Sequence, residues 1–372
     1  MTALLSLVLS DIAGAGDVVD PSLARSDHGD STLWYDIRNL DIEGRGWTDT
    51  KSFYDRLPSK AEGVVREPVW NLSHHSAGMC VRFVTGATDI RARWTLTSSS
   101  LSMPHMPATG VSGLDLYVRM DYGQWRWLAN GRPTEFPTNT AQLVSNLPKR
   151  EREYMLYLPL YNGVTSVEIG IPKQSVIAKA DPRDKGQRKP IVFYGTSITQ
   201  GGCASRPGMV HTAILGRWLN YPVINLGFSG NGRMEPEVAV LFAELDPSVY
   251  VLECLPNMVP EEITERVEPF VRTLRKAHPE TPLVLVEDRT YPNSFLVTSN
   301  RQHNRDNRAA LHAVFTRLIA AGIMNLYYLP GEDLLGEDGE DTVDGSHPTD
   351  LGFMRQAEAL YKVLEPILRG KE

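Results

Sequence analysis

Two polar residues near the end of the chain have the types and spacing of a general acid–base pair. Asp344 stands three residues before His347. A carboxylate this close can hold one tautomer of an imidazole, which leaves the other ring nitrogen free to accept a proton. Ser197, in Gly195-Thr196-Ser197-Ile198, follows a short apolar run, so it either caps the next helix or presents its hydroxyl to a substrate. Together the three residues predict nucleophilic catalysis by Ser197.

Two candidates for binding a negative charge lie between the serine and the acid–base pair. Gly230 follows the apolar run Val223 to Leu226, and Asn257 follows the apolar run Val249 to Leu252. Glycine lets a backbone N–H approach a developing oxyanion, and an amide side chain supplies a second donor. Each also has a plain reading, because glycine turns after strands are common and Asn257 could cap a helix. Their joint occurrence after consecutive runs favours an oxyanion site.

The C-terminal half contains the elements that must position these residues. From Pro190 onward, short β-rich apolar runs are separated by enough chain for a helix, which predicts a three-layer αβα fold around a parallel sheet. The carboxyl ends of parallel strands meet at one edge, where ligand sites form. The runs are Ile191 to Tyr194, Val223 to Leu226, Val249 to Leu252, Leu283 to Val286 and Leu326 to Leu329, and helical spacing of apolar residues marks 261–278 and 308–321.

The N-terminal half has a different period. Between about residues 33 and 172, polar and apolar residues alternate in short runs separated by turn-like residues, which predicts an antiparallel, jelly-roll-like β-sandwich. Tyr122 to Trp127 followed by Asn130 to Pro133 predicts a strand that enters a hairpin turn. Trp94, Trp125 and Trp127 either fill the core of this half or present aromatic faces to sugars, and the core is the favoured reading.

These patterns divide the chain into four parts: an N-terminal segment 1–26, a sandwich 27–178, a charged linker 179–189 that contains Pro182 and is followed by Pro190, and a catalytic domain 190–372. The apolar run Ala3 to Leu9 and the small residues Ala13 to Ala15 resemble part of a signal peptide but lack its basic region. The chain is therefore expected to be cytoplasmic as sequenced, or exported if a signal is truncated upstream.

Composition limits the possible partners. The chain has 372 residues and a formal net charge of −7, which gives no general attraction to nucleic acid or anionic membranes. No apolar stretch approaches the ~20 residues that cross a bilayer. Cys80, Cys203 and Cys254 are far apart and lack zinc-binding or disulfide spacing. We expect an enzyme without a metal or organic cofactor, and its oligomeric state is left open.

The motifs resemble a known family. In chain order, Gly195-Thr196-Ser197-Ile198, Gly230, Asn257 and Asp344 with His347 resemble the four blocks of SGNH or GDSL hydrolases. Gly113 to Tyr117 resembles the signature of the GxDLY domain that precedes some of them. The resemblance implies that Ser197 is the nucleophile, His347 its base and Asp344 the orienting group. It also implies an oxyanion hole formed by the Ser197 N–H, the Gly230 N–H and the Asn257 side chain.

Two departures from the family pattern stand out. Thr196 replaces the aspartate of Gly-Asp-Ser-Leu, and Leu255-Pro256-Asn257 replaces Gly-x-Asn. The second departure affects the backbone path of an oxyanion donor, although proline restricts φ and can hold the asparagine in place.

The resemblance also implies a substrate class, namely esters on carbohydrates and most simply acetyl groups. Arg206, Arg289 and Tyr291 follow elements near the predicted sheet edge and could bind such a substrate, or could be ordinary surface residues. Two alternatives remain. One is an acyltransferase that uses the same acyl-serine, and the other is a glycan-binding protein without catalysis.

Overall fold

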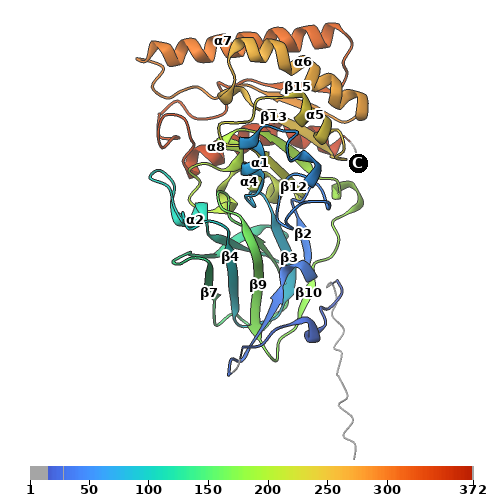
Figure 1. The fold of residues 1–372 in the computed structure, drawn as a ribbon, viewed down its shortest axis with the longest axis vertical. Helices are drawn as coiled ribbons and strands as arrows, with labels where there is room; N and C mark the ends of the chain where they lie inside the picture. Colours follow the sequence, from blue (N-terminus) through green and yellow to red (C-terminus); the bar gives the residue numbers. More distant parts are fainter. Residues whose placement is uncertain (1–15, 28, 371–372) are drawn as a thin grey trace, which may run out of the picture.

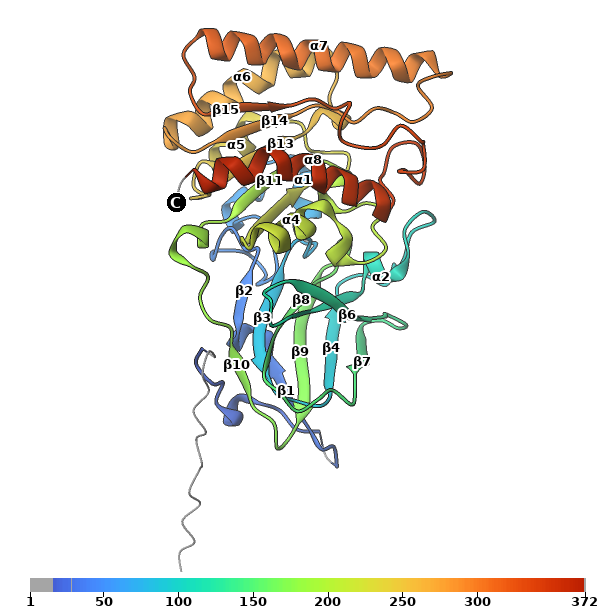
Figure 2. The same ribbon diagram turned by 180° about the vertical axis from the view of Figure 1, so that it is seen from behind.

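The computed structural model describes residues 16–27 and 29–370, which form a β-sandwich stacked on an α/β unit (Figures 1 and 2). The signal-like run at 3–9 and the small residues at 13–15 lie outside these described residues. In both views α6 (Pro260–Ala277) and α7 (Thr298–Ala320) lie at the end farthest from the sandwich.

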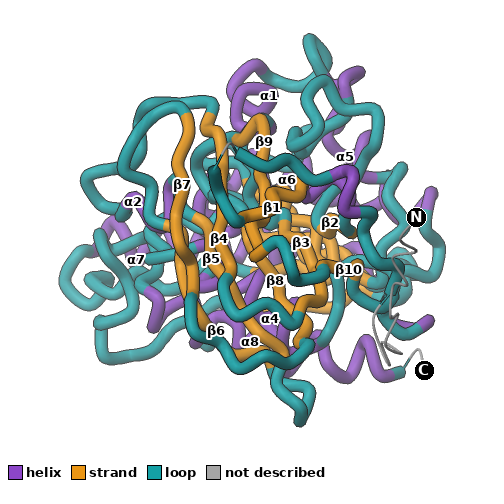
Figure 3. The backbone as a smooth tube through the Cα atoms, turned by 90° about the horizontal axis from the view of Figure 1, so that it is seen from below, coloured by secondary structure: helices purple, strands orange, loops and turns teal. Residues whose placement is uncertain are grey.

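The sandwich consists of two antiparallel sheets, as predicted. One has the order β1-β9-β4-β7, and the other has the order β10-β3-β8-β5-β6 with β2 paired to β3. Figure 3, seen from below, shows β7, β4, β9 and β1 side by side. Alternate residues point inward because strands have a period of two, so Phe83, Trp94 and Leu116 are fully buried between the sheets. The strands are β1 (Thr32–Asp36), β2 (Asp41–Glu43), β3 (Cys80–Thr85), β4 (Ile90–Leu96), β5 (Leu114–Arg119), β6 (Trp125–Gly131), β7 (Thr138–Val144), β8 (Arg152–Tyr157), β9 (Val164–Pro172) and β10 (Ile177–Lys179).

The hairpin prediction was wrong in position. Residues 130 and 131 continue β6, and the turn lies before that strand, where the Gly123 N–H donates to the Met120 carbonyl at 2.8 Å. Gly123 has φ +84°, a conformation that glycine adopts without strain. The tryptophans divide between the two readings: Trp94 is buried in the core, whereas Trp127 is 50% exposed.

The α/β unit confirms the predicted parallel sheet, with the order β12-β11-β13-β14-β15. This order reverses direction at β11, which creates a switch point where open sheets bind ligands. The strands are β11 (Ile191–Gly195), β12 (Val223–Gly227), β13 (Val249–Glu253), β14 (Leu283–Val286) and β15 (Leu326–Leu329). The other α-helices among the described residues are α1 (Glu67–Ser73), α2 (Ala108–Val111), α3 (Ser197–Gln200), α4 (His211–Leu219), α5 (Pro236–Phe242) and α8 (Asp350–Arg369).

Each face of the parallel sheet packs against its own helices. Alternate strand residues such as Val192 and Tyr250 pack with α5, α6 and α7, and the intervening residues such as Phe193 and Val251 pack with α4 and α8. Both faces are therefore covered, as the continuous apolar runs require. Among the described residues, no helix combines the length and the apolar character needed to cross a membrane.

One segment of the N-terminal half belongs to the core of the α/β unit. Trp47, Leu57 and Trp70 pack in the same cluster as the strands and α5. Within this segment Arg56 is buried, and its guanidinium donates to the carbonyls of Asn225 at 3.1 Å and Gly227 at 2.7 Å, both in β12. Burial lowers the pKa of Arg56 to about 9. The segment from Trp47 to Trp70 precedes the linker 179–189 in the chain but packs on the α/β unit. The domain boundary at 179–189 is therefore still a proposal.

Candidate active site

Ser197 occupies the switch point of the parallel sheet. It is the first residue of α3, directly after β11, and the Thr196 side chain caps this helix by accepting from the Ile198 N–H at 3.2 Å. Capping is therefore done by Thr196, which leaves the Ser197 hydroxyl free for another partner. Because the first N–H groups of a helix have no intrahelical acceptor, the Ser197 N–H is also free to bind an anion.

The acid–base pair lies against this serine. His347 Nε2 is 2.9 Å from Ser197 Oγ, and His347 Nδ1 is 2.8 Å from Asp344 Oδ2. The other carboxylate oxygen, Oδ1, accepts from the backbone N–H groups of Ser346 and His347. Burial raises the pKa of Asp344, but the hydrogen bonds from His347 and Ser346 outweigh it and lower the pKa to about 2. The ionised carboxylate favours the tautomer with hydrogen on Nδ1, which leaves Nε2 able to accept the serine proton.

The predicted oxyanion donors lie on the neighbouring loops. Gly230 follows β12 and has φ +69° with open space around its Cα, so backbone conformation and not crowding favours glycine there. Asn257 ends a short 3-10 helix after β13, and its amide faces the N–H groups of Asn231 at 3.0 Å and Gly232 at 3.2 Å. Two donors identify the facing atom as the amide oxygen. Its NH₂ group is therefore available as a donor.

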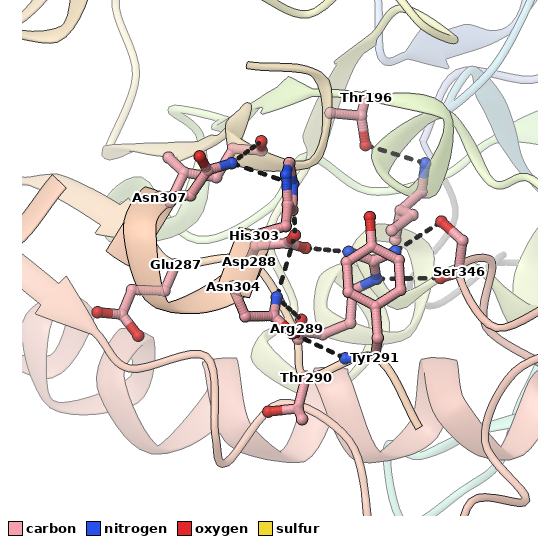
Figure 4. A network of polar contacts seen from close by, with 12 residues as sticks. Thr196, Glu287, Asp288, Arg289, Thr290, Tyr291, His303, Asn304, Asn307 and Ser346 are labelled. Carbon is pink, nitrogen blue, oxygen red and sulfur yellow. Dashed lines mark hydrogen bonds and ion pairs between the residues drawn. The ribbon is translucent and has the colours of Figure 1, made fainter. Parts of the chain in front are cut away.

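Arg289 and Tyr291 are two of the predicted substrate contacts. Arg289 lies against Ser346, in the loop that carries the acid–base pair, and Tyr291 lies beside Arg289 (Figure 4). The Arg289 guanidinium donates to the Ser346 carbonyl at 3.1 Å and to Ser346 Oγ at 2.5 Å, and it pairs with Asp288. Arg289 is only 4% exposed, and its Cζ lies 4.2 Å from the centroid of the Tyr291 ring, on which the guanidinium stacks. With its polar groups occupied in this way, Arg289 holds Ser346, one of the two residues between Asp344 and His347, in place.

Arg206, the third predicted substrate contact, is bound by the sandwich. Its guanidinium donates to Asp115 at 2.7 Å and to the Tyr117 hydroxyl at 2.5 Å. Asp115 is fully buried and also accepts from the Gly208 N–H and from Trp127 Nε1. The Gly-x-Asp-Leu-Tyr motif at 113–117 thus joins the two halves.

Two residues near the pair were not predicted from the sequence. His105, from the sandwich, has its ring centroid 5.7 Å from that of His347. Cys203 follows α3, is buried and has φ +73°. Burial and the nearby Asp344 charge raise the pKa of its thiol to about 12, so the thiol is neutral at ordinary pH. Neither residue lies in a motif, so only the folded chain reveals their place.

A parallel sheet with a serine at its switch point and a histidine–aspartate pair after its last strand defines the architecture of SGNH-type hydrolases. Consistent with this, the family model described as "GDSL-like Lipase/Acylhydrolase family" matches residues 188–365. The GxDLY model, described as the "N-terminus of Esterase_SGNH_hydro-type", matches residues 32–177. A protein of Bacteroides ovatus ATCC 8483, described as GDSL-like, is 35% identical with a TM-score of 0.85, over 91% of this chain and 98% of that one. The chain belongs to the GDSL-like lipase/acylhydrolase family.

More distant structures share the fold. The salicylyl-acyltransferase SsfX3 from a tetracycline biosynthetic pathway has a TM-score of 0.68 at 18% identity, over 92% of this chain and 97% of that one. A family two carbohydrate esterase from Clostridium thermocellum, solved with cellohexaose, has a TM-score of 0.55 at 17% identity, over 80% of this chain and 94% of that one. The comparison with curated proteins gave no match. At these identities the likeness concerns the fold alone.

Proposed function

We propose that this protein is a serine-dependent ester hydrolase that removes acetyl or other small acyl groups from carbohydrates. The observation that carries the proposal is the continuous path from Asp344 through His347 to Ser197, with contacts of 2.8 and 2.9 Å. A hydroxyl with a base at hydrogen-bond distance, oriented in turn by a carboxylate, is the arrangement that acyl transfer through a serine needs.

The proposed mechanism begins when His347 Nε2 takes the Ser197 proton and Oγ attacks the ester carbonyl. The Ser197 and Gly230 N–H groups and the Asn257 amide stabilise the resulting oxyanion. His347 then protonates the leaving alcohol, which yields an acyl-serine. A water molecule, deprotonated by His347, attacks this intermediate and releases the acid while the serine regains its proton.

The carbohydrate part of the proposal is supported by two observations. Family two carbohydrate esterases, one of them solved with cellohexaose, share the two-part fold. The half-exposed Trp127 offers an aromatic face of the kind on which sugars stack. A screen of acetylated, methylated and longer-acyl saccharides should give the highest kcat/KM for acetyl esters. Failure to release acid from any saccharide, alongside hydrolysis of simple aryl esters, would remove the carbohydrate assignment.

An acyltransferase is the second candidate, favoured by the fold likeness to SsfX3. The two reactions differ only in whether water or another alcohol attacks the acyl-serine. The Asp344 and His347 side chains are 38% and 23% exposed, so water reaches the base, which favours hydrolysis. Incubation with an activated acetyl ester and acceptor sugars should yield free acetate as the main product, and an acetylated acceptor as the main product would reverse the order of the two candidates.

The direct test of the nucleophile is Ser197→Ala. We expect p-nitrophenyl acetate hydrolysis to fall by about 10⁴-fold or more, because loss of the serine removes the covalent route. Ser294→Ala, in the loop before α7, provides a matched control and should retain the wild-type rate. Unchanged hydrolysis by purified Ser197→Ala would refute the proposed mechanism and leave the glycan-binding alternative.

A further inference from the structure

A turn of the sandwich brings a histidine to the candidate active site. Met103 and Met106 exchange backbone hydrogen bonds of 3.0 and 3.1 Å, which places His105 at the tip of a two-residue turn. Met106 is buried and anchors the turn, whereas His105 is exposed. Figures 1 and 2 both show the segment before α2 reaching from the sandwich toward the α/β unit.

This turn completes a cluster of four groups that can each donate an electron pair. One donor atom from each of His105, Cys203, Asp344 and His347 lies within 4.8 Å of the others. The cluster combines two imidazoles, one thiol and one carboxylate. Three of its members come from the α/β unit and one from the sandwich, so no spacing in the sequence indicates it.

We propose that these four residues bind Zn²⁺ and that the bound ion inhibits the enzyme reversibly. Nitrogen, sulfur and oxygen donors in a set of four are the ligands that tetrahedral zinc prefers. Zinc–ligand bonds of about 2.0–2.3 Å imply ligand atoms about 3.3–3.8 Å apart, so the cluster must contract by about 1 Å. The exposed turn at His105 can supply this movement.

Binding has a defined chemical consequence. The Cys203 thiol gives up its proton to solvent and its sulfur bonds to the metal, while a His347 nitrogen and an Asp344 oxygen become ligands. His347 can then no longer accept the Ser197 proton, so inhibition follows from occupancy alone. Mg²⁺ and Ca²⁺ prefer sets of oxygen ligands and should have no effect.

The activity test rests on the proposed esterase function. Wild type, His105→Ala, Cys203→Ser and the α7 control His312→Ala are freed of metal and assayed with p-nitrophenyl acetate over a range of Zn²⁺ concentrations, each against its own zinc-free rate. We expect His105→Ala and Cys203→Ser to raise the half-inhibitory Zn²⁺ concentration by at least about tenfold, since each loses one ligand. His312→Ala should match wild type, and a chelator should restore the rate. Equal zinc sensitivity in all four proteins would overturn the proposal.

A binding test separates the zinc site from the proposed function. Ser197→Ala, which retains all four ligands, is titrated with Co²⁺ as a spectroscopic substitute for Zn²⁺. A thiolate-to-cobalt charge-transfer band should appear and be lost on addition of Zn²⁺, and the Ser197→Ala/Cys203→Ser double variant should lack it. The band would support the site even if the wild type proved to have no esterase activity. Its absence from Ser197→Ala would overturn the site whatever the wild type hydrolyses.

Discussion

The α/β unit and the sandwich contribute to the candidate active site in different ways. The α/β unit supplies all five residues of the proposed mechanism from the segments that follow the carboxyl ends of its strands, so the topology of the sheet brings them together. The N-terminal half, which comprises the sandwich and the segment from Trp47 to Trp70 that packs on the α/β unit, supplies side chains that hold those loops. Arg66 donates to Asn231 Oδ1 at 2.7 Å and to Glu235 at 2.6 Å, beside Gly230, and Asp115 binds Arg206 after α3. The residues proposed to react thus lie in the α/β unit, and residues of the N-terminal half fix the segments that carry them.

The largest expected effect is on the chemistry of the α/β unit. Asp344→Asn should lower kcat by about 10⁴-fold, because the amide favours the wrong imidazole tautomer. Circular dichroism should show an intact fold, and Asp121→Asn on the sandwich serves as the control with near-normal kcat. A loss of less than tenfold would mean that His347 does not need this carboxylate.

Asn257→Ala should come next, with kcat lower by about 10²–10³-fold and KM little changed, since one oxyanion donor acts mainly in the transition state. Steady-state kinetics with p-nitrophenyl acetate provide the measurement. A change confined to KM would place the amide in substrate binding and would leave the oxyanion with the two N–H donors.

The ion pair between Arg206 and Asp115 of the sandwich should contribute to the free energy of unfolding. Arg206→Met leaves the buried Asp115 carboxylate without its cation, which should lower the free energy of unfolding by about 3 kcal/mol. Urea denaturation measures this, and kcat/KM of the folded protein for a small ester should stay within a few-fold. The opposite pattern, with unchanged stability and a much higher KM for saccharide esters, would make Arg206 a substrate contact as the sequence suggested.

Arg289→Ala tests whether this arginine positions Ser346 or binds substrate. If the arginine positions Ser346, kcat should fall by about 10–10²-fold at constant KM, because a small displacement of His347 weakens proton transfer. If instead it binds substrate, KM should rise and kcat should hold.

The smallest effect concerns acid stability. The folded pKa of Asp344, about 2, lies below its ordinary value of 3.8. Its contribution to stability is therefore complete above pH 3.8 and disappears as the pH falls toward 2. Because the side chain is 38% exposed, the Tm difference between wild type and Asp344→Asn should be only about 1–2 °C. Thermal melts between pH 6 and pH 2 should show it shrinking below pH 4, and a constant difference would contradict the assignment.

The sequence predicted the parts of the molecule whose signals are local. The five strands of the parallel sheet follow from runs such as Ile191 to Tyr194, and the site residues follow them directly. The segment from Trp47 to Trp70 has no clear period, so its packing on the α/β unit was not foreseen.

The partners of long side chains were also not predictable from the sequence. Arg206 and Arg289 were placed near the correct edge, but the partner of a flexible arginine depends on tertiary structure, which brought Asp115 and Ser346 within reach. No sequence pattern indicated a role for His105, because isolated histidines are common in loops. Only the folded chain brings it next to His347.

The buried Arg56 has a consequence for how the protein folds. Its guanidinium joins the Leu72 and His75 carbonyls of its own segment to the Asn225 and Gly227 carbonyls of β12. Deleting the first 189 residues would leave those β12 carbonyls without this donor and would uncover the apolar face that Trp47 and Leu57 fill. We therefore expect the α/β unit to depend on the N-terminal half for its folding. The two halves should melt as a single cooperative transition, and the catalytic half expressed alone should fail to fold.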